Sequence, residues 1–406
     1  DGRARRGDAE GAGRWLRGMS LAGQTPDVAC HNSVMNAHAR SGDLEGIARA
    51  FQELAASGLA PDVFSYNTAI GSCARASDMA QADRWLRSMR AAALQPDAIS
   101  FTAAIGGAAR SGDTARVGAL LAEMQETGVE ADAICFNAAV DGFCKSGRPA
   151  EAAGLLEAAR SARVSPDERA YNSIIDCYAK GGAIPEASRW LDALRGASLR
   201  PSASTYNSVV NGCGQAGLPE EAKRWFGAMR AEGVQPDTIS FNALMKALCR
   251  GGDLEAAASQ LGEMRRAACR PDEVSYTTLV QGCARRGDAA GAERLFGLMT
   301  ADRLTADAVA YTSLVDAYAR AADADSACEV LQRMAASRVR PTVVTWTAAI
   351  SACARARPRR HREAEDLLHR MLRSRAVPNS VTCAVLDRAL GRARREELCR
   401  APSARP

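Results

Sequence analysis

Aromatic residues and histidines are scarce in this 406-residue chain, and long apolar runs are missing. Phe, Trp and Tyr together make up 5% of the residues, and His occurs four times. An apolar fraction of 47% with so few rings leaves a core of Ala, Leu, Val and Met, which suits closely packed helices rather than a β-sandwich or barrel. No apolar run reaches the roughly 18 residues of a membrane-spanning helix, so we expect no membrane segment.

Signatures of catalysis are also missing. The sequence holds no GxxxxGK[ST] phosphate loop, no GxSxG nucleophile elbow, and no His-x-Glu with Cys-x-x-Cys of the zinc deaminases. His361 and His369 stand eight residues apart in a basic stretch, and we do not expect them to bind a metal. We therefore expect no enzyme activity within these residues, no metal and no cofactor. The net charge of +5 does not by itself indicate a nucleic-acid partner.

A period of 35 residues dominates the chain. Nine blocks of equal length run from Val28 to Thr342, each with His, Tyr or Phe in the fourth place and Asn or Thr in the fifth. Most blocks close with Pro-Asp. A fixed period in this range indicates a stacked array whose neighbours share one core, so the length does not imply several globular domains.

One block, residues 63–97, shows the pattern within a repeat. Apolar residues from Tyr66 to Ala74 follow an i, i+3, i+4, i+7, i+8 spacing, which predicts a helix with Ser65 as its N-cap. Asp78 follows a short break and predicts the N-cap of a second helix. Pro96 ends that second helix, because proline cannot continue it. Each repeat is therefore predicted to be two antiparallel helices.

The thirteen cysteines support this organisation. They form no Cys-x-x-Cys pair, and many recur ten to twelve residues into a block, namely Cys73, Cys144, Cys177, Cys213, Cys249, Cys283 and Cys353. This regular placement does not offer a disulfide framework. We interpret them as small buried residues of the first helices in a reducing compartment.

The repeats divide the chain into five segments. We predict a partial N-terminal repeat, reduced to its second helix, at 1–27, nine 35-residue repeats at 28–342, a longer tenth repeat at 343–379, a partial repeat helix at 380–392, and a basic disordered tail at 393–406. The extra residues of the tenth repeat lie near 357–361, a basic bulge between helices. The start of the chain inside a repeat predicts a fragment or a processed form.

Blocks such as Ser65-Tyr66-Asn67-Thr68 and Thr205-Tyr206-Asn207-Ser208, closing with Pro-Asp or a variant, resemble the pentatricopeptide repeat. The likeness covers about residues 3–392, and the uniform length resembles the pure, P-type class of that family. Tetratricopeptide repeats have 34 residues and a Trp-Leu-Gly-Tyr pattern that is absent here. The resemblance implies an all-α fold, an α-solenoid of tandem helix-turn-helix repeats wound as a right-handed superhelix, and a family that reads one RNA base per repeat.

In that family the fifth residue and the last residue of a repeat face the base. Carried over, the pairs are Asn32 with Asp62, Asn67 with Asp97, Thr102 with Asp132, Asn137 with Asp167, Asn172 with Ser202, Asn207 with Asp237, Asn242 with Asp272, Thr277 with Asp307, Thr312 with Thr342, and Thr347 with Asn379. The resemblance implies U for Asn-Asp, G for Thr-Asp, C for Asn-Ser and A for Thr-Asn, which reads 5′-UUGUCUUG[A/G]A-3′. An ionised Asp only accepts hydrogen bonds, which suits the N–H groups of uracil and guanine.

The same residue types also cap helices and form turns. However, a cap alone should admit Ser, Asp and Gly at the fifth place, which holds only Asn or Thr in ten repeats. We therefore favour the base-facing interpretation.

Two further rows follow the period. Large apolar residues recur in the second place, where the family sandwiches the base: Phe64, Ile99, Ile134, Ile239, Val274, Val309 and Val344. Arg169 and Ser204 depart from this row. Cations recur in the thirteenth place, as candidates for binding phosphate: Arg40, Arg75, Arg110, Lys145, Lys180, Arg250, Arg285, Arg320 and Arg355. Gln215 breaks that row, and the alternative is a cation favoured by the dipole of the helix C-terminus.

Two hypotheses for function remain. The first is a monomer that binds single-stranded RNA in a mitochondrion or chloroplast, with no membrane association, and acts in RNA stabilisation, processing, splicing or translation. Other organelle RNA-processing or ribosomal proteins are further expected partners. The second is a tetratricopeptide-like scaffold for protein interactions within a ribonucleoprotein assembly, which would show no base preference.

Overall fold

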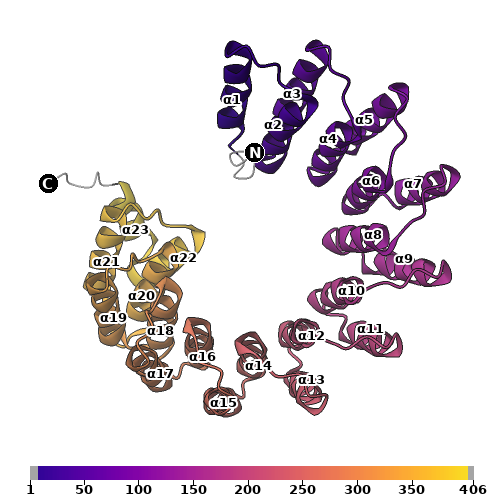
Figure 1. Ribbon diagram of the computed structural model, residues 1–406. Helices are drawn as coiled ribbons and strands as arrows, with labels where there is room; N and C mark the ends of the chain where they lie inside the picture. The colour runs from indigo at the N-terminus through magenta and orange to yellow at the C-terminus, as the bar shows by residue number, and fades with distance from the viewer. Residues whose placement is uncertain (1–7, 401–406) are drawn as a thin grey trace. The chain divides into compact units, whose positions relative to one another are not determined.

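The computed structural model describes residues 8–400, which form 23 α-helices and, within that range, no β-strand (Figure 1). The chain divides into two compact units, one ending at Pro201 and the other starting at Ser202, and each is described by itself. None of the helices in the described range is long and apolar enough to cross a membrane. The prediction of an all-α fold built from paired helices is confirmed.

The N-terminal unit holds one single helix and five helix pairs. Its helices are α1 (Ala9–Leu21), α2 (Val28–Ser41), α3 (Leu44–Ala56), α4 (Val63–Arg75), α5 (Met79–Ala91), α6 (Ala98–Ser111), α7 (Thr114–Glu126), α8 (Ala133–Lys145), α9 (Pro149–Ser161), α10 (Glu168–Lys180) and α11 (Ile184–Gly196). The first helices α2, α4, α6, α8 and α10 pack against one another in one row, and the second helices form another row beside them (Figure 1).

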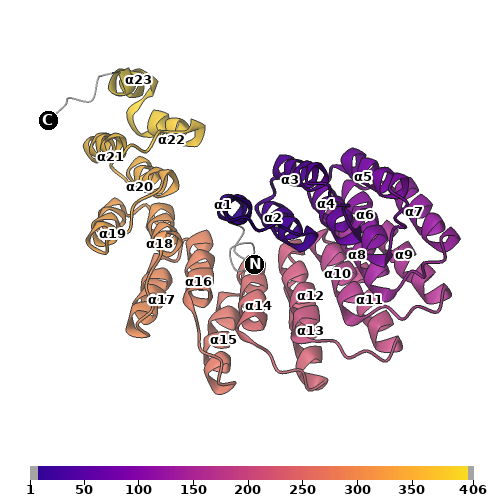
Figure 2. The same cartoon turned by 45° about the horizontal axis from the view of Figure 1, so that its top comes forward.

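The C-terminal unit repeats this arrangement. Its helices are α12 (Ala203–Ala216), α13 (Pro219–Ala231), α14 (Thr238–Gly251), α15 (Leu254–Arg266), α16 (Glu273–Arg286), α17 (Ala289–Ala301), α18 (Ala308–Arg320), α19 (Ala324–Ala336), α20 (Val343–Arg355), α21 (His361–Arg373), α22 (Ser380–Leu390) and α23 (Arg392–Arg400). Figure 2 shows α12, α14, α16, α18, α20 and α22 following one another as first helices.

The core lies between the two helices of a pair and the next pair. In the seventh repeat, the fourth-place ring of Phe241 on α14 is fully buried and lies 5.0 Å, centroid to centroid, from Phe226 on α13. Ala257 and Met264 on α15 are also fully buried. Small side chains bring first helices close together: at Gly142 of α8, a side-chain Cβ would lie 2.8 Å from the Gly106 carbonyl oxygen of α6. The cysteines whose side chains the structure describes, which are all except Cys399, are free, and half of them are buried.

The first helices begin three residues earlier than the apolar spacing predicts. Asp62, not Ser65, is the N-cap of α4, and its side chain accepts a hydrogen bond from the Ser65 backbone. Ser65 instead completes a capping box, because its hydroxyl accepts from the Asp62 backbone N–H at 3.3 Å. The prediction of Ser65 as the cap is therefore wrong, whereas the prediction of Asp78 as the N-cap of the second helix is confirmed.

The C-terminal prediction also needs correction. Residues 393–400, expected to be disordered, belong to α23, where Leu398 is buried. Ion pairs hold this charged helix, with Arg394 Nε at 2.7 Å from Glu365 and Arg395 Nε at 2.6 Å from Asp387. One buried leucine among so many charges gives no apolar spacing, so the sequence carries little signal for it. Residues 1–7 and 401–406, at the ends of the predicted first and last segments, lie outside the described range.

Candidate functional site

The fifth-place and last residues of a repeat lie at the same edge of the first-helix row. Each last residue is the N-cap of the following first helix, and in several repeats of each unit it meets the fifth-place side chain of the helix before it. In the N-terminal unit, Asn32 Nδ2 donates to Asp62 Oδ1 at 3.1 Å, and Asn67 Nδ2 donates to Asp97 Oδ1 at 3.0 Å. The predicted pairs are thus joined directly in the first two repeats.

The C-terminal unit contains two more direct pairs. Asn207 Nδ2 lies 3.2 Å from Asp237 Oδ1, and Asn242 Nδ2 lies 3.1 Å from Asp272 Oδ1. The four Asn-Asp pairs that are joined directly therefore use the same two atoms.

In the ninth and tenth pairs, the hydroxyl of a third residue joins the two side chains. Thr312 Oγ1 lies 2.7 Å and Thr342 Oγ1 3.0 Å from the hydroxyl of Thr345. Thr347 Oγ1 lies 2.8 Å from Thr382 Oγ1, which donates to Asn379 Oδ1 at 2.9 Å.

Other predicted pairs are not joined by a hydrogen bond within the described residues. These are Thr102 with Asp132, Asn137 with Asp167, and Thr277 with Asp307. For the fifth pair, Asn172 belongs to the N-terminal unit and its Nδ2 donates to Glu168 Oε1 at 3.1 Å, while Ser202 is the N-cap of α12 in the C-terminal unit.

Third-place hydroxyls, which the sequence reasoning missed, complete these networks. Ser65 Oγ donates to Asn32 Oδ1 at 2.6 Å, Ser275 Oγ donates to Asn242 Oδ1 at 2.6 Å, and Ser100 Oγ donates to Asn67. These three serines are fully buried. The available signal was the recurrence of Ser or Thr in this place, at Ser65, Ser100, Thr205, Ser240, Ser275, Thr345 and Thr382.

Hydrogen bonds keep several of the last-place carboxylates ionised. Burial acts to raise the pKa of Asp62, but bonds from the Ser65 backbone, the Ser65 hydroxyl and the Asn32 amide outweigh it, and the pKa is lowered. The same balance lowers the pKa of Asp97 and of Asp237. A carboxyl with a lowered pKa stabilises the fold at neutral pH, and this contribution is lost as the pH falls through the acidic range where it protonates. At neutral pH these groups therefore only accept hydrogen bonds.

The predicted second-place row is exposed. Its seven apolar side chains have between 49% and 68% of their surface open to solvent, with Val309 the least and Ile134 the most exposed. Val381, at the same place on α22, is 60% exposed and was not predicted as part of the row. Arg169 and Ser204, which depart from the row, are exposed as well. The core therefore does not use these regularly spaced apolar side chains.

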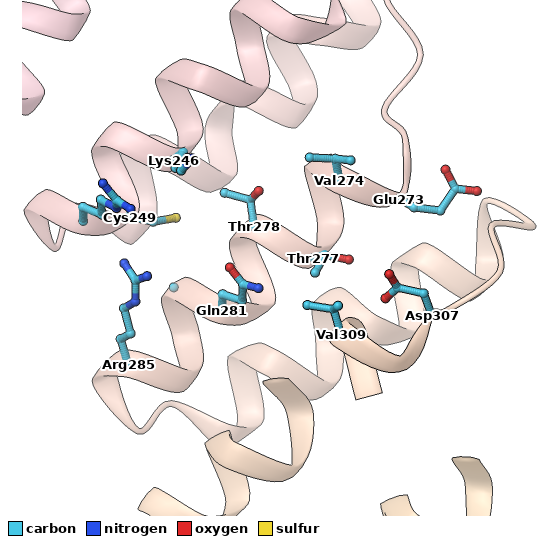
Figure 3. Close-up of a pocket in the computed structure, with 12 residues that line it drawn as sticks. Lys246, Cys249, Glu273, Val274, Thr277, Thr278, Gln281, Arg285, Asp307 and Val309 are labelled. Atoms are coloured by element: carbon cyan, nitrogen blue, oxygen red, sulfur yellow. The ribbon is translucent and has the colours of Figure 1, made fainter. Parts of the chain in front are cut away.

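A cavity of about 370 Å³ brings these features together around the eighth repeat (Figure 3). Thr277 lies between Val274 of its own helix and Val309 of the next first helix, with Asp307 beside it. The side chain of Arg285 stands at the other end of this cavity (Figure 3). Lys246 and Arg250 of α14 also line this cavity. One end of the cavity thus carries apolar and polar side chains, and the other end carries a cationic side chain.

The thirteenth-place cations fall into groups with different partners. Three arginines donate to a carbonyl at the end of the preceding first helix: Arg75 to Ala39 at 3.4 Å, Arg110 to Ala74 at 2.8 Å, and Arg250 to Gly214 at 3.0 Å. Three others pair with an aspartate one helical turn earlier: Lys145 with Asp141 at 2.7 Å, Lys180 with Asp176 at 2.5 Å, and Arg320 with Asp316 at 2.9 Å. The arginines of the first group thus bond to the C-terminal end of the neighbouring first helix, and the charge of the second group is compensated locally.

No group of three side chains suited to a metal ion occurs among the residues that the structure describes. Comparison with curated protein sequences found no match.

Solved structures with a similar fold include the maize pentatricopeptide repeat protein PPR10. The two sequences are 20% identical, and the structures superpose with a TM-score of 0.63 over 98% of this chain and 61% of that chain. This chain therefore spans less than two thirds of PPR10. A complex of PPR10 with an 18-nt psaJ RNA element matches at 20% identity and a TM-score of 0.40, over 91% of this chain and 68% of that one. Yeast Rmd9p with a 16-nt target RNA matches at 8% identity and a TM-score of 0.46, over 87% and 81%.

Three family models match along the chain. The pentacotripeptide-repeat region of PRORP matches residues 19–209, the PPR repeat family matches 201–250 and 236–285, and a model described as pentatricopeptide repeat-containing protein matches 277–397. Together they follow one another from residue 19 to residue 397 without a gap. With the paired helices and the constant 35-residue length, these matches place the chain in the pentatricopeptide repeat family, among its pure, P-type members.

Proposed function

We propose that this protein binds single-stranded RNA and reads one base with each repeat, in the order 5′-UUGUCUUG[A/G]A-3′. The observation that carries the proposal is the repeated juxtaposition of a polar pair with exposed apolar side chains. In the eighth repeat, Thr277 and Asp307 line one cavity with Val274 and Val309. A base between two such valines would bury both its faces and turn its edge toward the polar pair.

The hydrogen-bonding groups left over in an Asn-Asp pair complement uracil. Asn242 uses one Nδ2 hydrogen on Asp272 Oδ1, which leaves the second hydrogen as a donor and Asp272 Oδ2 as an acceptor. Uracil offers a carbonyl oxygen next to its N3–H, so a donor and an acceptor side by side match its edge. This chemistry supports the base assignment that the family resemblance implies.

For the cellular role, we propose that RNA held in this way is occluded or remodelled, with consequences for transcript stability, processing, splicing or translation. A mitochondrion or a chloroplast is the proposed compartment, and other RNA-processing or ribosomal proteins are the proposed further partners. The chain acts by binding rather than by chemistry on the RNA.

The direct test is binding of the decamer U-U-G-U-C-U-U-G-A-A by the purified chain at moderate salt. We expect at least tenfold tighter binding than to a scrambled decamer of the same composition, because base contacts differ while phosphate contacts are the same in both. Fluorescence anisotropy gives both dissociation constants. Equal affinities would contradict sequence-specific binding and favour the scaffold hypothesis.

Salt dependence tests the cationic end of the cavity. Replacing Arg285 with Gln is expected to weaken binding to every RNA sequence alike and to lower the slope of log K against log salt by about 0.7, the value for one single-strand phosphate contact. Arg285→Lys keeps the charge and should keep the slope. An unchanged slope in Arg285→Gln would remove this side chain from the phosphate-binding row.

A further inference from the structure

We propose that the buried third-place serine of the following repeat orients the fifth-place asparagine and thereby sharpens its base preference. The serines concerned are Ser65, Ser100 and Ser275, and none of them contacts the base itself. This inference rests on the proposed function and names positioning residues that act on the base through the asparagine.

The geometry around Asn242 leaves one consistent arrangement of hydrogens. Asp272 Oδ1 accepts from the Ser275 backbone N–H at 2.9 Å and from Asn242 Nδ2 at 3.1 Å. The Ser275 hydroxyl accepts from the Asp272 backbone N–H at 3.2 Å and lies 2.6 Å from Asn242 Oδ1 and 2.9 Å from Asp272 Oδ1. The hydroxyl has a single proton, and the shorter contact is to the asparagine oxygen.

This arrangement holds the asparagine amide at both ends. If the amide turned over, Asn242 Oδ1 would face a carboxylate oxygen, and the bond from Nδ2 to Asp272 would be lost. With the serine present, Oδ1 is also held toward the serine by a hydrogen bond, so the remaining N–H of Asn242 is the group that we expect to meet the base. An amide that shows only a donor favours uracil over cytosine, because the exocyclic N4–H₂ of cytosine needs an acceptor at that edge.

The first two repeats have the same contacts. Ser65 Oγ lies 2.6 Å from Asn32 Oδ1 and 2.8 Å from Asp62 Oδ1, and the Ser65 backbone N–H donates to Asp62 Oδ1 at 2.9 Å. In the sixth repeat the hydroxyl of Ser240 instead donates to Asp237 Oδ1 at 2.8 Å, and Asn207 Oδ1 has no partner among the described residues. The proposal therefore covers the first, second and seventh repeats.

The fourth repeat lacks this hydroxyl. Its pair is Asn137 with Asp167, and the third-place residue of the next helix is Ala170, which is buried like the serines. Asn137 Oδ1 is buried and has no hydrogen-bond partner in the described part of the chain, and no bond joins Asn137 to Asp167. The chain thus carries Asn-Asp pairs both with and without this serine.

Two reciprocal substitutions in the full chain test the proposal. Ser275→Ala is expected to lower the preference for U over C at the seventh base about fivefold, and Ala170→Ser to raise it about fivefold at the fourth base, the effect of one net hydrogen bond. The measurement is the ratio of dissociation constants for decamers that differ only at the base concerned. The other positions should keep their ratios.

A matched control separates positioning from stability. Ala310→Ser places the same hydroxyl after Thr277, which has no amide to orient, so the preference at the eighth base should change less than twofold. Thermal unfolding of each variant records the structural effect. If Ser275→Ala and Ala170→Ser shift unfolding but leave both ratios unchanged, the proposal is overturned while the proposed function stands. If the unaltered chain shows no preference at the seventh base, the proposed function fails and this inference fails with it.

Discussion

Phe241→Ala is expected to lower the free energy of unfolding by about 3–5 kcal/mol, the usual cost of removing a fully buried ring. Phe241 has no exposed surface, and its edge contact with Phe226 joins α14 to the preceding pair. A repeat array is held together by neighbouring contacts alone, so the loss should weaken α13, α14 and α15 before distant helices. Urea unfolding followed by circular dichroism, with hydrogen exchange resolved by helix, measures both effects.

The control for this substitution stands two residues earlier on the same helix. Ile239 is 65% exposed, so Ile239→Ala should change the free energy of unfolding by no more than about 0.5 kcal/mol. The same change should weaken RNA binding, because Ile239 belongs to the exposed second-place row. Equal destabilisation by both substitutions would mean that the exposed row is part of the core and would argue against its proposed contact with bases.

Asn242→Thr is expected to change the preferred seventh base from U to G. In the ninth and tenth repeats the fifth-place threonines donate their hydroxyl proton to their own helix, Thr312 to Ala308 at 2.6 Å and Thr347 to Val343 at 2.7 Å. A threonine bonded in this way shows the base an acceptor where asparagine shows a donor. Two acceptors side by side match guanine, whose N1–H and N2–H₂ are adjacent donors.

We expect the ratio of the dissociation constants for U and G to change roughly a hundredfold, from about tenfold in favour of U to about tenfold in favour of G. This size follows from about 1–3 kcal/mol for each well-placed contact between a side chain and a base. Decamers with U or G at the seventh base provide the measurement. Thr277→Asn is the reciprocal change and should move the eighth base from G to U. The double variant should then prefer a decamer in which these two bases are exchanged, and an unmoved preference in either single variant would refute the pairing of side chains with bases.

The repeat length and the apolar spacing were sufficient to predict the fold, because paired helices that cannot bury their apolar faces alone must stack. The start of the first helices could not be predicted in the same way. The spacing begins at the fourth-place ring, whereas Asp62 starts α4 through bonds to backbone groups, which leave no apolar signal. Helix α23 was missed for a related reason, since Arg394 and Arg395 hold it by ion pairs.

For the candidate site, six of the ten pairs listed from the sequence are joined in the structure, but the sequence did not show how they would bond. Asn67 and Asp97 are thirty residues apart, and their contact follows once the first helices stack. The serine that joins such pairs could not be distinguished from an ordinary helix-start residue, because only the stacked structure shows that its hydroxyl reaches into the preceding repeat. The sequence also did not show that the thirteenth-place cations have different partners. Lys180 and Arg110 hold the same place in their repeats, but Lys180 pairs with an aspartate and Arg110 donates to a backbone carbonyl.

The double duty of the last residue constrains how such a protein changes its target. Asp62, Ser202, Thr342 and Asn379 all start a helix, and each is also a residue that we propose to face a base. Ser, Thr, Asp and Asn are the side chains that start helices well, and replacing one by Ala costs about 1 kcal/mol. The need for a helix cap therefore limits which residues can stand at this position, whatever base they would recognise. Drift toward Lys, Glu or Leu would remove the cap of the next first helix, so evolving or engineering a new target should favour exchange among these four residues and changes at the fifth place.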